Sequence, residues 1–145
     1  MIEFIPVSAL PKTISPALIE RAARVLEKQL KPKAPCRIGI RFVTADAIQK
    51  LNKTYRHKNA PTDVLSFSAD LQKGVPNTEQ EKGDLVICPS FAVREAKRRG
   101  IDPREELMRL VVHGTLHLFG FDHEIKTDEA RMFGRQERLL EQIFS

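Results

Sequence analysis

The spacing of apolar residues along the chain predicts four strands and five helices. Short apolar or alternating runs indicate strands, because successive side chains of a strand point to opposite faces of a sheet. Apolar residues that recur every three or four positions indicate helices with one buried side. The expected strands cover residues 2–7, 37–43, 64–68 and 84–88, and the expected helices begin near residues 16, 45, 90, 103 and 127.

Local residue chemistry marks the ends of these helices. Ser15, Thr44 and Asp102 each stand directly before a helical pattern, where a side-chain oxygen can accept a hydrogen bond from a free N–H group of the first turn. Proline follows Ser15 and Asp102 at the first helical position, which suits its fixed φ angle. Gly100 follows the basic helix that begins near residue 90, and we expect it to end that helix.

The region between the third and fourth strands is expected to be irregular. Residues 72–82 are polar, contain glycine and proline, and show no hydrophobic period. Because no helix separates the two strands, antiparallel pairing is easier than a crossover. Ile48, Leu51 and Tyr55 recur at helical spacing in the second helix. The apolar residues of the last helix are expected to face the core, namely Met132, Phe133, Leu139, Leu140 and Ile143.

The composition is that of an ordinary globular protein with one domain over residues 1–145. Hydrophobic residues make up 41% of the chain, but no apolar run approaches the ~20 residues of a membrane span. The N-terminus lacks the basic stretch of a signal peptide. Cys36 and Cys88 form no CxxC pair, which suits buried thiols in a reducing compartment and leaves metal ligation by either open. We therefore expect a cytoplasmic protein without membrane association.

The charge pattern favours anionic partners. The chain has 24 basic and 19 acidic residues and a formal net charge of +5. Each basic cluster alone is typical of a solvated helix face, whereas all of them together make RNA or another polyphosphate a reasonable partner. The clusters are Lys28, Lys31 and Lys33; Lys50, Lys53, Arg56 and Lys58; and Arg94, Lys97, Arg98 and Arg99.

Three of the four histidines lie within residues 113–123, whose sequence is HGTLHLFGFDH. On a helix, His113 and His117 lie one turn apart on the same face, so that their imidazoles can bind one ion. Gly120 can adopt a left-handed conformation, end the helix and bring His123 to the same ion. Three imidazoles without a fourth protein ligand form an open metal site, which is typical of catalysis. The alternative is a histidine pair on a helix face and a third histidine nearby by chance.

Gly114 distinguishes this motif from that of metallopeptidases. The spacing of the three histidines and Gly120 is that of the metzincin peptidases, in which a glutamate follows the first histidine and acts as the general base. Gly114 stands at that position, and glycine can neither take nor give a proton. The ligand pattern is therefore present, and the peptidase base is missing.

Three segments together resemble the YbeY family of bacterial rRNA-maturation endoribonucleases. They are the histidine motif, the sequence NKTYRHKNAPTDVLSF at residues 52–67 and the sequence GDLVI at residues 83–87. The resemblance extends to the C-terminus and includes Met132, Gln136 and Glu137. It implies an α+β fold in which about five helices pack on a mixed four-stranded sheet, with the metal site on a helix of the C-terminal half and the loop that follows.

The resemblance also implies an activity and partners. The implied activity is metal-dependent cleavage of single-stranded RNA in the maturation of the 3′ end of small-subunit rRNA and in ribosome quality control. The implied cofactor is one zinc ion on His113, His117 and His123, beside a basic cleft in which Arg56 is functionally important. The implied partners are rRNA and components of the small ribosomal subunit. The oligomeric state stays open, and a monomer is compatible with the sequence.

Two residues depart from the family pattern. Phe121 stands where tyrosine is common, so that no phenolic hydroxyl is available there for substrate contact or proton transfer. Asn59 stands where an acidic residue is common, which removes one partner for the neighbouring cations. Neither residue is an expected metal ligand.

Arg56 is the strongest candidate for contact with the substrate. Its guanidinium can donate two hydrogen bonds to one phosphate and stabilise charge in the transition state. The alternative is a surface ion pair of Arg56 with Asp63 or Glu95. Lys58 is a weaker candidate for contact with the substrate.

Other groups have roles that stay open. Asp84 and Asp122 could orient imidazole N–H groups, or they could act in turns and caps. Zinc can lower the pKa of a bound water towards ~7. The nucleophile could be this metal-bound water or the 2′-hydroxyl group of the RNA, and no residue of the motif is an obvious general base.

Three functions from different classes are compatible with the sequence. A zinc endoribonuclease is the favoured one. A zinc metallohydrolase that acts on peptides or another non-RNA substrate is the second, and Gly114 argues against it. A non-catalytic, zinc-containing ribosome-binding protein is the third, and the missing fourth ligand argues against it.

Overall fold

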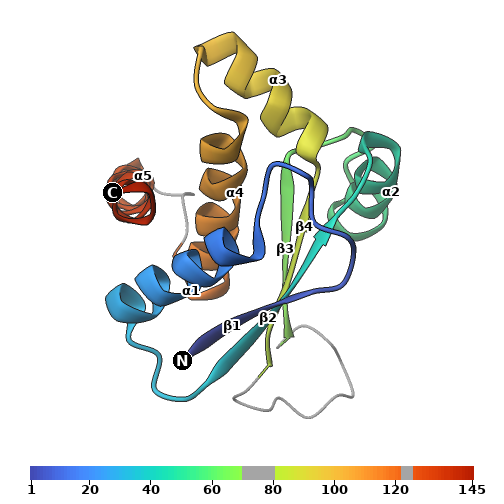
Figure 1. Ribbon diagram of the computed structural model, residues 1–145. Coiled ribbons are helices and arrows are strands. Elements are labelled where there is room, and N and C mark those ends of the chain that lie inside the picture. The colour runs from blue at the N-terminus through green and yellow to red at the C-terminus, as the bar shows by residue number, and fades with distance from the viewer. Residues whose placement is uncertain (70–80, 122–125) are drawn as a thin grey trace.

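A mixed four-stranded sheet forms the centre of the fold (Figure 1). The computed structural model describes residues 1–69, 81–121 and 126–145. Its strands are β1 (Ile2–Pro6), β2 (Cys36–Phe42), β3 (Val64–Ser68) and β4 (Glu81–Ile87), in the spatial order β1-β2-β4-β3. β1, β2 and β4 are parallel, and β3 is antiparallel to β4. The α+β fold and the antiparallel pairing of the third and fourth strands are therefore confirmed.

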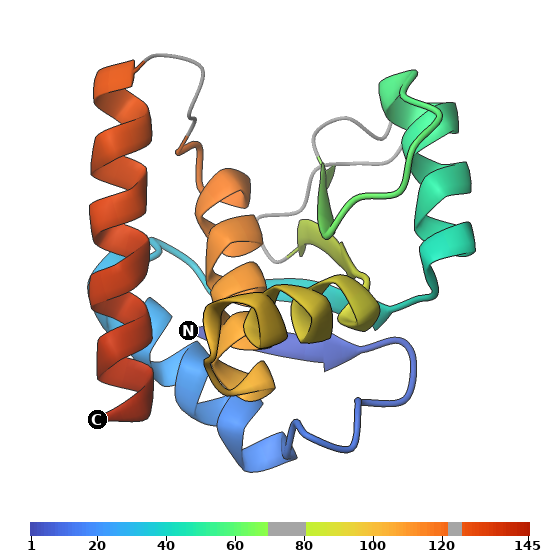
Figure 2. The ribbon, with the colours of Figure 1, turned by 90° about the horizontal axis from the view of Figure 1, so that it is seen from above.

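The five helices begin close to the predicted positions. They are α1 (Pro16–Leu30), α2 (Ala45–Arg56), α3 (Pro89–Arg99), α4 (Pro103–Leu118) and α5 (Lys126–Phe144). The side chains of Ser15, Thr44 and Asp102 accept hydrogen bonds from N–H groups of the first turns of α1, α2 and α4. Figure 2 shows α4 and α5 on one side of β3 and α2 on the other.

The alternation of side chains along the strands builds a core on each face of the sheet. Ile38, Ile40, Leu85 and Ile87 are fully buried in the larger core, which also contains apolar residues of α1, α4 and α5. Leu65 and Val86 point to the opposite face and pack with Ile48 of α2 in a smaller core. Residues that are neighbours in β4, such as Leu85 and Val86, therefore belong to different faces.

Two predictions are wrong in detail. β4 begins at Glu81, three residues before the expected start, because its polar first residues extend the pairing with β2 next to an irregularity at Arg37 and Ile38. Phe133 was expected in the core, but it is 61% exposed. The other expected core residues of α5, Met132, Leu139, Leu140 and Ile143, are buried.

Gly114 allows α4 to lie close to the sheet. A Cβ atom at this position would come within 2.7 Å of Leu85 Cδ2 and 3.1 Å of Ser66 Oγ. The Ser66 hydroxyl donates a hydrogen bond of 3.2 Å to the carbonyl oxygen of Gly114. Since real side-chain atoms do not approach so closely, glycine sets the distance between α4 and the strands β3 and β4.

A buried arginine joins α4 to α5. Arg109 donates from Nε and a terminal nitrogen to the two carboxylate oxygens of Glu137, at 2.9 and 3.0 Å, and from its other terminal nitrogen to Glu106 at 2.6 Å. Burial alone would lower the pKa of Arg109, but its bonds to Glu137 and Glu106 raise it above the ordinary arginine value. Arg109 is therefore charged at neutral pH and well above it.

Two further findings concern the cysteines and the helices. Cys36 and Cys88 are both buried, and both are free thiols. Among residues 1–69, 81–121 and 126–145, no helix combines the length and the apolar character that crossing a membrane requires.

We expect the substitution Arg109→Leu to lower the free energy of unfolding by about 2–4 kcal/mol, because Glu106 would stay buried with only Arg99, at 3.3 Å, as a partner. Urea denaturation at neutral pH measures this change. Arg98→Leu is the matched control, since Arg98 pairs with Glu95 on the surface of α3 and its loss should hardly move the midpoint. Equal midpoints for both variants would contradict the role assigned to Arg109.

Candidate active site

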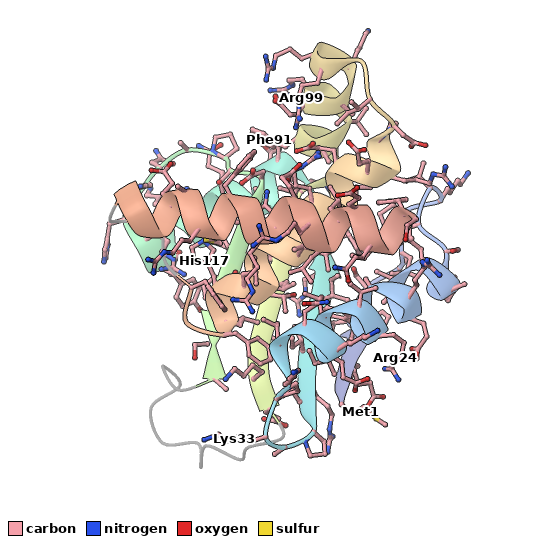
Figure 3. The ribbon with its side chains drawn as sticks, turned by 90° about the vertical axis from the view of Figure 1, so that its left-hand side faces the viewer. Met1, Arg24, Lys33, Phe91, Arg99 and His117 are labelled. Atoms are coloured by element: carbon pink, nitrogen blue, oxygen red, sulfur yellow. The ribbon has the colours of Figure 1, made fainter. Side chains whose placement is uncertain are left out.

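His113 and His117 form a pair on the last two turns of α4. Their Nε2 atoms are 3.0 Å apart, and their ring centroids are 4.6 Å apart with an interplanar angle of 75°. Both side chains are half-buried. Figure 3 shows His117 next to the N-terminal half of α5 (Lys126–Phe144). The helical spacing thus brings the two imidazoles together as the sequence predicts.

Gln136 of α5 holds the ring of His113 from the other side. Its Oε1 lies 2.8 Å from Nδ1 of His113, and its Nε2 donates a hydrogen bond of 3.1 Å to Glu137. A carboxylate accepts only from an N–H group, so the amide nitrogen of Gln136 must face Glu137 and its oxygen must face His113. Nδ1 of His113 therefore carries the proton, and Nε2 presents a lone pair towards His117.

The orientation of Gln136 depends in turn on the ionised state of Glu137. Burial raises the pKa of Glu137, but the hydrogen bonds that its carboxylate accepts from Arg109 and Gln136 outweigh burial and hold the pKa below the ordinary value. The carboxylate consequently stays charged near neutral pH. A continuous chain of charged and hydrogen-bonded groups leads from the buried Arg109 to the imidazole of His113.

The donor set of the pair suits a metal ion. Two imidazole nitrogens that bind one zinc ion at about 2.0–2.1 Å cannot be more than about 4.2 Å apart, and the observed 3.0 Å meets this limit. Within the described parts of the chain, no third His, Cys, Asp or Glu joins the pair. His123, the predicted third ligand, and Asp122 lie outside the described residues.

The chain turns at Gly120 as the motif predicts. α4 ends at Leu118, and Gly120 has a φ angle of 90° and donates its N–H to the carbonyl oxygen of His117. Such an angle suits glycine, because it has no Cβ atom. Phe121, one of the departures from the family pattern, follows this turn, and the guanidinium of Arg135 lies 4.9 Å from its ring centroid.

The histidine pair opens into a pocket of about 610 Å³ beside β3. Arg56 and Lys58 line this pocket together with His113 and His117. Arg56 is the last residue of α2, where His57 ends the helix in a left-handed conformation. Its guanidinium donates a hydrogen bond of 2.6 Å to the carbonyl oxygen of Ser66 and lies 5.8 Å from the ring centroid of Phe67.

The alternative ion pairs of Arg56 do not form in the structure. Glu95 bonds instead to Arg98 on its own helix, and Asp63 accepts a hydrogen bond from the N–H group of Val64. Asn59, the second departure from the family pattern, accepts a hydrogen bond from Gln49 of α2. This contact joins the loop after Arg56 to α2 through an amide side chain, where other members of the family commonly have an acidic one.

Asp84 does not orient the imidazoles, contrary to one of its two expected roles. It lies in the middle of β4 on the face opposite to α4, since its neighbour Leu85 packs against Gly114 of α4. Gln136 performs this role for His113. In the sequence it is only a polar residue among the apolar positions of the last helix, and the structure buries it.

Comparisons with known proteins identify the family of the chain. The family profile described as Endoribonuclease YbeY matches residues 8–144. The Endoribonuclease YbeY of Macrococcus caseolyticus is 43% identical over 108 residues, which cover 71% of this chain and 69% of that protein. Its counterpart in Chloroflexus aurantiacus is 40% identical over 134 residues, which cover 88% of this chain and 86% of that protein. A solution structure from Thermotoga maritima is similar with a TM-score of 0.64, 27% identity and coverage of 99% and 89% of the two chains.

The fold and the site define an α+β protein with a histidine pair and an arginine in one pocket beside the sheet. The match over residues 8–144 and the identity with these relatives show that the chain belongs to the YbeY family of endoribonucleases.

We expect the substitution Gln136→Leu to change the tautomer of His113 in the metal-free protein. Without the amide oxygen, the Nδ1 proton loses its acceptor, and the Nε2–H form should become the major one. Long-range 1H–15N spectra distinguish the two forms. Gln142→Leu on the exposed side of α5 is the control and should leave the wild-type Nδ1–H form. An unchanged spectrum in Gln136→Leu would show that Gln136 does not set the tautomer.

Proposed function

We propose that this protein is a zinc-dependent endoribonuclease that cleaves single-stranded RNA in the maturation of the 3′ end of small-subunit rRNA and in ribosome quality control. The observation that carries the proposal is that His113, His117 and Arg56 line one pocket. The relatives' name, Endoribonuclease YbeY, supports RNA as the substrate. We further propose His123 as the third zinc ligand, a cytoplasmic location, and rRNA and the small ribosomal subunit as partners.

The groups that line the pocket support cleavage of a phosphodiester as the reaction. When bound, zinc supplies a Lewis acid that acidifies water and polarises a phosphoryl oxygen. Arg56 uses one of its five N–H donors on Ser66, and the others are available to a phosphate that enters the pocket. The bond to Ser66 restrains the guanidinium, so that it can stabilise developing negative charge without first being ordered. Lys58 adds a second positive charge to the same pocket.

The packing of Gly114 argues against a peptidase of the metzincin type. A glutamate there would have to fit where a single Cβ atom already comes within 2.7 Å of Leu85 Cδ2. The position of the peptidase base thus lies inside the contact between α4 and the sheet. We therefore expect a generic peptide library to survive incubation with the zinc-loaded protein.

We expect cleavage of a single-stranded RNA to require both zinc and His117. His117→Ala and chelation should each abolish cleavage, and His117→Ala should also lower the zinc content below one ion per chain, because one imidazole ligand is lost. A fluorescent single-stranded oligonucleotide and elemental analysis provide the two measurements. The control is His57→Asn, which removes a histidine outside the pair and keeps a residue that tolerates the left-handed conformation. Undiminished cleavage by zinc-free protein would refute the proposal.

We expect Arg56→Lys to lower the turnover rate by roughly 10- to 1000-fold while RNA affinity changes little. Lysine keeps the charge but loses the two-pronged contact with phosphate and the orientation that Ser66 imposes. Single-turnover cleavage and filter binding separate the two effects. Lys53→Gln, one turn earlier on α2, is the control for lost charge and should weaken binding slightly at an unchanged turnover rate. Near-normal turnover in both Arg56→Lys and Arg56→Ala would exclude Arg56 from the chemistry.

A further inference from the structure

A second pocket lies on the opposite face of the sheet. Its volume is about 520 Å³, and its walls include Arg41 of β2, Tyr55 of α2, Phe67 of β3 and Asp84 of β4. It belongs to the face that carries the smaller core, away from the histidine pair. Volumes of this size, with apolar walls and a few polar groups, are typical of sites for small molecules or single groups of a larger ligand.

The sequence of β2 makes room for the carboxylate of Asp84. Gly39 pairs with Asp84 across the two strands, and a Cβ atom at Gly39 would lie 2.1 Å from Asp84 Oδ1. Glycine weakens a strand and often marks a place where another group approaches the backbone closely. Here that group is the Asp84 carboxylate, so the substitution of any other residue for Gly39 would displace it.

Two of the three charged groups of the pocket, Asp84 and Arg41, have no partners in the described parts of the chain. Neither Asp84 nor Arg41 takes part there in a side-chain hydrogen bond or an ion pair. Asp84 is nevertheless half-buried, and a half-buried carboxylate without a donor is costly. Arg41 stands two residues after Gly39 on β2, in register with Val86, so it is placed diagonally to Asp84 on the same face. A ligand with both donors and acceptors would satisfy the two groups together.

Aromatic side chains form another wall. Tyr55 and Phe67 are in edge-to-face contact, with ring centroids 5.3 Å apart and an interplanar angle of 72°. Tyr55 is 61% exposed, which is unusual for a large aromatic group and leaves its ring available. Proteins that bind single-stranded RNA stack unpaired bases on such rings and read the base edge with polar side chains.

We propose that this pocket binds a guanine base of the RNA substrate. The Watson–Crick edge of guanine carries two adjacent N–H donors, N1–H and the 2-amino group, next to the acceptor O6. A carboxylate can accept both donors, and an arginine beside it can donate to O6. Adenine and cytosine present only one amino group beside a ring acceptor, and uracil places carbonyl oxygens on both sides of its single N–H. Only guanine therefore matches Asp84 and Arg41 at once.

Arg56 connects this pocket to the candidate active site. It lines both pockets, as does Ser68, and β3 is the outer strand of the described sheet between them. A single strand of RNA that crosses the edge of β3 can thus place a phosphate at Arg56 near the histidine pair and a neighbouring base against Tyr55. This inference rests on the proposed endoribonuclease function and adds a preference for guanine close to the cleaved bond.

Tyr55 itself supplies a probe for the test. It is the only tyrosine of a chain that has no tryptophan, so the tyrosine fluorescence lifetime reports on this pocket alone. GMP should shorten the lifetime in a saturable way, and AMP, CMP and UMP, which carry the same phosphate, should do so only at higher concentrations. A lifetime is used because it is insensitive to light absorbed by the nucleotides.

Two substitutions test the recognition of the base edge. Asp84→Asn should weaken GMP binding by about 5- to 150-fold and improve AMP binding, because an amide offers one acceptor and one donor and matches adenine. Gly39→Ala should weaken GMP binding while Asp84 is retained, because the new Cβ atom displaces the carboxylate. Asp46→Asn in the first turn of α2 is the control for lost charge and should change nothing.

The outcomes separate this inference from the proposed function. Equal effects of the four nucleotides, or no effect of Asp84→Asn, would overturn the guanine site even if the protein cleaves RNA. Preference for GMP that is lost in Asp84→Asn would support the site even if no cleavage is found. On a randomised RNA, the wild type should favour guanine at a fixed distance from the cleaved bond, and Asp84→Asn should lose that preference. Cleavage without any base preference would again overturn the inference.

Discussion

The bonds that Ser66 makes on both sides of β3 set the geometry of the candidate active site. Its hydroxyl donates to the carbonyl oxygen of Gly114 on the helix that carries the histidines, and its own carbonyl oxygen accepts from Arg56. The imidazole pair and the guanidinium come from helices that are far apart in sequence, and one residue of the sheet fixes the distance between them. This arrangement requires that α4 lie very close to β3, which the absent side chain of Gly114 permits. Gly114 therefore has two effects: it leaves the position of the peptidase base without a side chain, and it allows the close packing on which the geometry of the site depends.

A buried ionic chain supports the pair from the other side. Arg109 and Glu137 tie α4 to α5, and Gln136 extends this contact to His113. A charged group held in a protein interior by several bonds resists displacement, because moving it would leave its partners buried and unsatisfied. The position of His113 is therefore constrained by the packing of two helices as well as by its own helix. Such preorganisation lowers the cost of ordering a site when a ligand arrives.

The sequence predicted the features that depend on neighbouring residues and missed those that depend on contacts between distant ones. Strand alternation, helix caps and the pairing of His113 with His117 follow from periodicity within one element, and the structure confirms them. The role of Gln136 depends on how α5 packs on α4, which no local pattern encodes. One of the two roles considered for Asp84 requires it to face the imidazoles, whereas its position next to Leu85 places it on the opposite side of the strand from the larger core. Tyr55 recurs at the helical spacing of Ile48 and Leu51, and its 61% exposure depends on how α2 packs on the sheet, which this spacing does not encode.

The hydrogen bond from Arg56 to Ser66 has a consequence for solubility as well as for chemistry. An outer strand presents backbone groups that can pair with a strand of another molecule, and proteins often protect such edges with charged side chains. In β3 the guanidinium of Arg56 occupies the outward carbonyl of Ser66 and places a positive charge on the edge. If two molecules met through this edge, their Arg56 side chains would repel each other. The carbonyl oxygen of Ser66, at the middle of β3, would already be bonded to Arg56. The bond of Arg56 to Ser66 would thus also disfavour assembly of the protein through this edge of its own sheet.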